Sequence, residues 1–145
     1  RHMKKVMTLD ILSKTANEVI KNVRDLSRDT ATLITLSGDL GTGKTTLTQE
    51  IAASLGIKEQ IISPTFVIIK KYSTTDPKFK NLIHIDAYRL GKSEELMKLG
   101  WHELLGDKDN LVILEWPENV PDCIPKDVFK IVLSHLDDNT RSIEF

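Results

Sequence analysis

The chain has 145 residues, of which 40% are hydrophobic and 28% are charged, a composition typical of one globular domain rather than a disordered segment. Its 20 basic and 21 acidic residues give a net charge of −1, so there is no basic excess for broad contact with a nucleic-acid backbone, and we expect no DNA binding. No apolar run approaches the ~20 residues of a membrane-spanning helix, and the single cysteine, Cys123, excludes an internal disulfide and favours a reducing, cytoplasmic location.

The hydrophobic pattern predicts helices alternating with short strands. Arg1-His2, before Met3, is interpreted as the remnant of an expression tag, and residues 3–145 as one domain. In chain order, the predicted elements are a helix over about 13–26, a strand over 32–36, a helix over 44–55, a strand over 66–72, a hairpin loop over 74–80, a strand over 82–86, a helix over 93–105, a strand over 111–115 and two closing strands over 128–133 and 141–145.

Polar residues and glycines mark the expected ends of the three helices. Ser13 or Asp10 is the candidate N-cap of the first helix, Ser93 is the candidate N-cap of the third, and Gly56 is the expected C′ residue of the second. The alternation of apolar strands and helices predicts an α/β fold of three layers, with a mainly parallel central sheet and added antiparallel strands.

A glycine-rich loop lies between the first predicted strand and the second predicted helix. Residues 38–45, GDLGTGKT, match the pattern G-x-x-x-x-G-K-[ST] in the strand-to-helix context that this motif requires, which predicts a P-loop NTPase-like fold. Glycines allow the backbone N–H groups to turn toward an anion. The candidate phosphate-binding residues are Asp39, Leu40, Gly41, Thr42, Gly43, Lys44, Thr45 and Thr46, with Lys44 also a candidate catalytic residue and Thr45 a candidate Mg²⁺ ligand.

Two carboxylates follow runs of four apolar residues at the ends of predicted strands. Asp86 follows LIHI and Glu115 follows LVIL. Ligands of open α/β sheets bind at the carboxyl ends of the strands, so either acid is a candidate ligand of Mg²⁺ and either is a candidate to orient an attacking water. The sequence does not separate these roles. His84 is expected to be a half-buried strand residue, and Trp116 is placed near the mouth of the site, where stacking on a base, contact with a partner and plain packing all fit.

Four motifs in fixed order give the chain a family resemblance. GDLGTGKTT at 38–46, SPTF at 63–66, HIDAYRL at 84–90 and EWPE at 115–118 resemble the TsaE family, also called YjeE. The resemblance implies a small bacterial P-loop ATPase that hydrolyses ATP weakly alone and acts with the TsaD and TsaB proteins. Those partners install the threonylcarbamoyl group on the adenosine beside the anticodon of tRNA, which this chain would contact only through the complex.

The same resemblance implies roles for individual residues. Thr65 is similar to a switch residue near the metal and the γ-phosphate, and Asp86 to a second switch carboxylate. Glu115 resembles the Walker B acid, and Trp116 resembles part of the nucleotide or partner surface.

Two other functions also fit a P-loop. One is a small-molecule kinase, although the sequence has no arginine-rich lid segment and no evident acceptor pocket. The other is a nucleotide-sensing scaffold without significant hydrolysis. ATP is favoured over GTP because the chain has no N-K-x-D run to recognise guanine.

Overall fold

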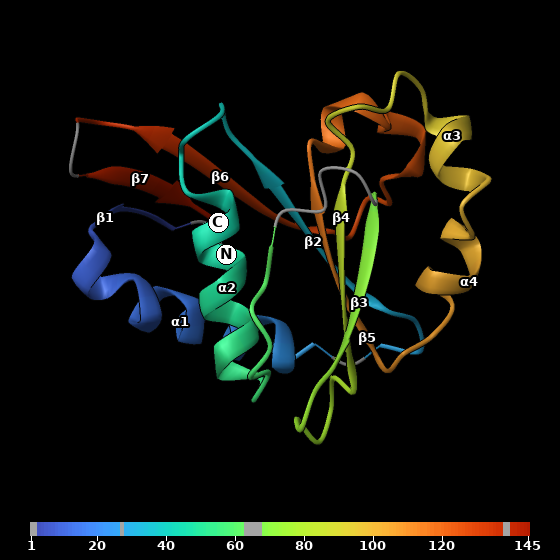
Figure 1. Ribbon diagram of the computed structural model, residues 1–145, viewed down its shortest axis with the longest axis horizontal. Coiled ribbons are helices and arrows are strands. Elements are labelled where there is room, and N and C mark those ends of the chain that lie inside the picture. Colours follow the sequence, from blue (N-terminus) through green and yellow to red (C-terminus); the bar gives the residue numbers. More distant parts are fainter. Residues whose placement is uncertain (1–2, 27, 63–67, 138–139) are drawn as a thin grey trace.

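A computed structural model describes residues 3–26, 28–62, 68–137 and 140–145 of the chain. The described residues form a seven-stranded sheet with the order β1-β7-β6-β2-β5-β4-β3 (Figure 1). The strands are β1 (Lys4–Met7), β2 (Thr32–Ser37), β3 (Ile69–Ser73), β4 (Asn81–Asp86), β5 (Asn110–Glu115), β6 (Phe129–His135) and β7 (Arg141–Glu144). The helices are α1 (Leu12–Arg24), α2 (Lys44–Ser54), α3 (Ser93–Met97) and α4 (Trp101–Leu105).

The centre of the sheet is parallel and its two edges are antiparallel. Strands β6, β2, β5 and β4 run in one direction, whereas β3 pairs antiparallel with β4, and β7 pairs antiparallel with both β6 and β1. The central strands β2, β4 and β5 are buried along most of their length, as expected for strands covered on both faces. This confirms the predicted mixed sheet.

Helices cover the two faces of the sheet and complete three layers. Helices α1 and α2 pack on one face, where Ile34, Leu36 and Ile113 contribute to the apolar core. Helices α3 and α4 lie over the other face, where Leu33 and Val112 meet the buried Trp101. Because side chains alternate along a strand, successive residues of the central strands supply the two cores in turn.

The structure corrects several sequence expectations. Strand β1 was not predicted. The strand expected over 66–72 begins at Ile69, and its first two expected residues lie outside the described part of the chain. The helix expected over 93–105 is two short helices, because Gly100 adopts a left-handed backbone (φ 90°) between them. Residues 1–2, interpreted as the remnant of an expression tag, also lie outside the described residues.

The predicted N-caps are wrong, whereas the predicted C′ glycine is confirmed. Ile11 occupies the N-cap position of α1 without a side-chain hydrogen bond, and Asp10 instead accepts a hydrogen bond from the Thr8 hydroxyl. Ser93 is the first residue of α3, and its hydroxyl accepts from the N–H of Asp122. Gly56 follows α2 with φ 80°, the left-handed conformation expected after a helix end.

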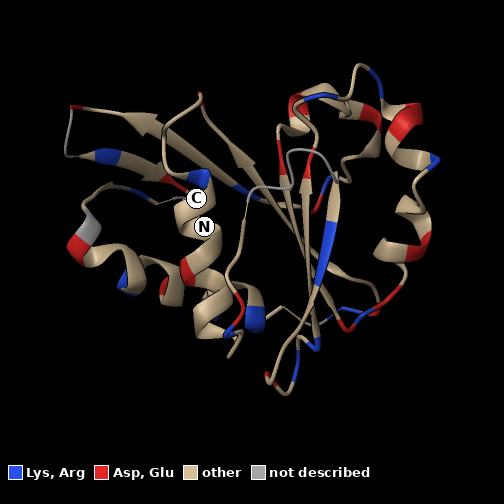
Figure 2. Ribbon diagram, in the orientation of Figure 1, with Lys and Arg blue, Asp and Glu red and all other residues tan. Residues whose placement is uncertain are grey.

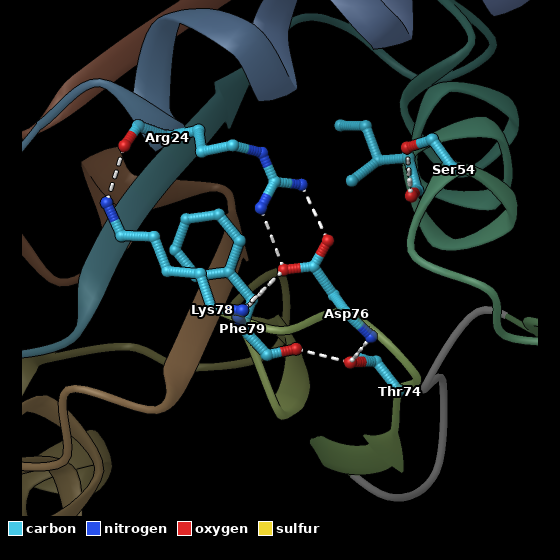
Figure 3. A network of polar contacts seen from close by, with 7 residues as sticks. Arg24, Ser54, Thr74, Asp76, Lys78 and Phe79 are labelled. Carbon is cyan, nitrogen blue, oxygen red and sulfur yellow. Dashed lines mark hydrogen bonds and ion pairs between the residues drawn. The ribbon is translucent and has the colours of Figure 1, made fainter.

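The predicted hairpin loop at 74–80 connects β3 to β4 and is fastened to the end of α1. Arg24 donates two hydrogen bonds to the Asp76 carboxylate, at 2.9 and 2.6 Å, and Lys78 Nζ donates to the backbone carbonyl of Arg24 (Figure 3). Lys78 Nζ also donates to the backbone carbonyl of Leu26. Phe79 is fully buried, with the Arg24 guanidinium 5.6 Å from its ring centroid. These contacts fix the hairpin against the helical layer and hold β4 in place at its start.

Candidate functional site

The predicted phosphate loop connects β2 to α2 and takes backbone conformations that glycine allows. Gly38, Gly41 and Gly43 have φ values of 150°, 79° and 99°. At Gly38 a Cβ atom would lie only 2.6 Å from the carbonyl oxygen of Leu133 in β6, so glycine is needed for this close approach. Gly43 is the N-cap of α2 and gives no side-chain cap, so the N–H groups of the first helical turn have no partner within the helix.

The uncapped end of α2 forms one wall of a pocket of about 440 Å³ at the carboxyl ends of the central strands. This position is where open α/β sheets bind their ligands. The lining residues are Leu40, Gly41, Gly43, Lys44, Thr45, Thr46, Ile68, Asp86, Tyr88, Arg89, Glu115 and Trp116. The structure therefore brings together nearly all of the candidate residues proposed from the sequence.

Lys44 is buried at the base of this pocket. Its Nζ atom donates hydrogen bonds to the carbonyl oxygens of Gly38 and Asp39, at 2.5 and 3.1 Å. The same ammonium group lies 4.6 Å from the centroid of the Trp116 ring, within the range of a cation–π contact. The loop thus holds a positive charge beside the free N–H groups of α2, an arrangement suited to an anion.

The two carboxylates predicted at strand ends are neighbours in the sheet. Asp86 of β4 is the register partner of Glu115 of β5, and the colouring of Figure 2 shows acidic positions at the ends of both strands. Asp86 is half-buried and accepts a hydrogen bond from the N–H of Tyr88 at 2.9 Å. Burial raises the pKa of Asp86. The hydrogen bond from Tyr88 lowers this pKa, and the nearby Glu115 raises it.

Glu115 has a buried partner that the sequence analysis did not identify. The Nε2 atom of His84 lies 2.5 Å from Oε2 of Glu115, and the two side chains are 0% and 4% exposed. His84 was expected to be half-buried, so its complete burial is a correction. The spacing of two residues puts His84 and Asp86 on the same face of the sheet, but only the register of β4 with β5 brings His84 to Glu115.

Aromatic side chains form the mouth of the pocket. The rings of Tyr88 and Trp116 are 5.0 Å apart between centroids, and Tyr88 is half exposed. Asn119, which the sequence analysis also missed, donates from Nδ2 to the carbonyl oxygens of Ala87 and Tyr88. This bond ties the segment after β5 to the segment after β4.

Two of the described candidate residues, Asp39 and Thr42, do not line the pocket. Asp39 is exposed, and its carbonyl oxygen accepts hydrogen bonds from both the N–H and the hydroxyl of Thr42. Thr42 is consequently buried within the loop. Thr65 lies outside the described residues.

Comparisons with known proteins show the family of this chain. Residues 11–143 match the family model described as threonylcarbamoyl adenosine biosynthesis protein TsaE. The chain belongs to the TsaE family. Similar members, each described as a tRNA threonylcarbamoyladenosine biosynthesis protein TsaE, come from Rickettsia prowazekii (39% identical; 75% of this chain and 73% of the relative), Bacillus subtilis (36%; 78% and 68%) and a Nostoc species (35%; 95% and 88%).

A solved structure is similar to this chain in fold. The crystal structure of Bacillus subtilis YdiB is similar to this chain with a TM-score of 0.73 and 27% identity, covering 100% of this chain and 84% of YdiB. The TsaE-family chain described here therefore has the predicted P-loop fold. Among its described residues there is no helix that is both long enough and apolar enough to span a membrane.

Proposed function

We propose that the protein is an Mg²⁺-dependent ATPase that supports the threonylcarbamoyladenosine modification of tRNA, working in the cytoplasm with TsaB and TsaD proteins. One observation carries the proposal: the uncapped N-terminus of α2, Lys44 and two strand-end carboxylates meet in one pocket. The helix N-terminus and Lys44 suit the negative charge of a polyphosphate, and the carboxylates suit a cation bound to that polyphosphate. Family membership supplies the biological process.

The loop residues would bind the phosphates. The first N–H groups of α2 and the ammonium group of Lys44 would receive the β- and γ-phosphates, with Thr46 at the rim for the α-phosphate. Tyr88 and Trp116 stand at the mouth of the pocket, where an aromatic face can stack on a base. Lys44 already lies within the pocket wall, so binding requires only that it exchange carbonyl partners for phosphate oxygens.

The donor set fits Mg²⁺. In the described ranges no three His, Cys, Asp or Glu side chains gather into a ready-made metal site. Mg²⁺ at nucleotide sites instead takes a hydroxyl, one or two carboxylates and phosphate oxygens, which Thr45 and either Asp86 or Glu115 would supply together with the nucleotide. The bound ion would neutralise charge that develops on the γ-phosphate.

Hydrolysis would then depend on placing a water molecule. Of Asp86 and Glu115, the acid that does not bind the cation is available to orient the attacking water. We expect slow turnover by the isolated chain, because in this proposal TsaB and TsaD complete the site. With basic and acidic positions interspersed over the fold (Figure 2), we assign tRNA contact mainly to those partners.

The decisive experiment measures phosphate release from ATP and Mg²⁺ by the chain alone, with TsaB and TsaD, and with tRNA added. We expect slow release by the chain alone and clear stimulation by the two partners. Fast release that the partners leave unchanged would argue against the proposal. Transfer of phosphate to a small acceptor would indicate a kinase, and tight nucleotide binding without release would indicate a sensing scaffold.

A further inference from the structure

His84 and Glu115 form a buried polar pair where the apolar core of the sheet meets the pocket. His84 lies opposite Ile113 in the register of β4 and β5, and Glu115 lies two residues beyond Ile113. Both side chains therefore project from the same face, toward α2, on a diagonal between neighbouring strands. A carboxylate accepts but does not donate, so the 2.5 Å contact places the ring proton on Nε2 of His84.

A structural role alone does not account for this pair. The surrounding residues of that face, such as Leu82 and Ile113, are fully buried and apolar. Burying a charged or polar pair costs desolvation, and well-packed apolar residues of similar volume are generally at least as stabilising. Within the described part of the chain, Nδ1 of His84 has no hydrogen-bond partner, which adds to that cost. Stability is therefore a weak explanation for this contact.

We propose that His84 is a positioning residue, which fixes the carboxylate of Glu115 against the pocket by hydrogen bonding to Oε2. A glutamate at the end of a strand has several rotatable bonds, and this bond selects one orientation. With Oε2 bound from the buried side, Oε1 is the oxygen left for a cation or a water molecule in the pocket that Glu115 lines. Such support behind a ligand oxygen gives a site its accuracy, and losing it typically costs about 10- to 100-fold in activity or metal affinity.

This inference rests on the proposed ATPase function, and its test is a double-mutant cycle. The single variants are His84→Leu, which removes the donor, and Glu115→Leu, which removes the acceptor, and the double variant combines them. His84→Gln supplies an amide N–H at similar reach and tests for rescue. His102→Leu is the matched control, because His102 is an exposed histidine on α4 that does not line the pocket.

In the partner-stimulated reaction, we expect His84→Leu to lower kcat by about 10- to 100-fold, while nucleotide affinity measured without Mg²⁺ changes by less than about threefold. His84→Gln should recover a substantial part of kcat, and His102→Leu should match the unaltered protein. In the Glu115→Leu background, His84→Leu should have little further effect, since no carboxylate remains for His84 to orient. An equal loss in both backgrounds, or no loss in either, would overturn the inference.

Two measurements without turnover keep the test independent of the proposed function. In nucleotide-free protein, the unfolding equilibrium constants of the four variants should show a coupling of about fivefold or more between the two positions. By calorimetry, His84→Leu should also reduce the gain in ATP affinity that Mg²⁺ provides. If the unaltered protein binds Mg²⁺ and ATP but releases no phosphate even with its partners, the ATPase proposal fails. If that protein is active while His84→Leu shows neither the coupling nor a reduced Mg²⁺ effect, the role of His84 fails alone.

Discussion

Lys44 and Trp116 both line the pocket and are in contact, with Nζ 4.6 Å from the centroid of the indole ring. Trp116 is the one non-glycine residue with a positive φ, 60°, among those that the structure describes. Its N–H donates to the carbonyl oxygen of Leu36 at 3.3 Å, which joins the turn after β5 to the end of β2. A bulky residue pays for this conformation in backbone energy, and such strain is concentrated at functional sites.

Replacing Lys44 by alanine is expected to weaken nucleotide binding strongly. The variant loses a charged donor that would bind phosphate oxygens, which predicts about a 10- to 100-fold lower affinity for ATP by calorimetry. Lys71→Ala is the matched control, since Lys71 is exposed on β3 and does not line the pocket. Equal affinities for the two variants would contradict the placement of the phosphates at Lys44.

The contact between Lys44 and Trp116 also predicts a fluorescence signal. Phosphate binding should draw the ammonium group away from the indole face, so the emission of Trp116 should change as ATP saturates the protein. Trp101 is buried, does not line the pocket and donates from Nε1 to the carbonyl of Cys123, so its emission should not respond. Trp116→Phe should therefore abolish the change, and a persistent signal in that variant would contradict the assignment.

Replacing each of three glycines by alanine is expected to lower the stability of the protein by different amounts. Gly38→Ala combines a positive φ with a backbone atom 2.6 Å from the new Cβ, and should cost about 2–4 kcal/mol of unfolding free energy. At Gly43 the φ is also positive, but an added Cβ has open space around it, so Gly43→Ala should cost about 1–2 kcal/mol of unfolding free energy. Gly91→Ala meets only the end of the flexible Glu95 side chain and should stay within about 0.5 kcal/mol. Denaturant unfolding would show whether this order holds.

The sequence predicted those parts of the site that depend on local pattern. The phosphate loop is a contiguous motif, and each apolar strand ending in an acid could be recognised by itself. Because parallel strands end at one edge of a sheet, Asp86 and Glu115 were expected together, and the register places them directly opposite each other. The same reasoning gave the alternation of helices and strands.

The remaining features depend on tertiary contacts. The pair of His84 and Glu115 requires the register between β4 and β5, which the spacing within one strand does not supply. Strand β1 spans only Lys4–Met7 and is held by pairing with β7. The break at Gly100 reflects a left-handed backbone that helical periodicity does not reveal, and the Asp10 carboxylate has its own partner in Thr8.

Asp76 is expected to make the stability of the protein sensitive to acid. The Arg24 guanidinium, together with the N–H groups of Phe79 and Lys78, lowers the pKa of Asp76 from 3.8 to about 2. A carboxyl group with a lowered pKa stabilises the folded state fully above its unfolded pKa, and this contribution is lost as the pH falls toward the folded pKa. The loss should therefore occur between about pH 4 and pH 2.

The variant Asp76→Asn removes this dependence. It should be less stable than the unaltered protein at pH 6 by up to about 2 kcal/mol, reduced by solvent screening at Arg24, whose side chain is 35% exposed. The difference should shrink as the pH is lowered from 4 to 2, because the protonated aspartic acid no longer pairs with Arg24. Asp127→Asn is the control: Asp127 is also paired with an arginine, Arg28, but its side chain is 70% exposed, so its effect should be much smaller. Urea unfolding at several pH values would measure both, and parallel curves for Asp76→Asn and the unaltered protein would contradict the assignment.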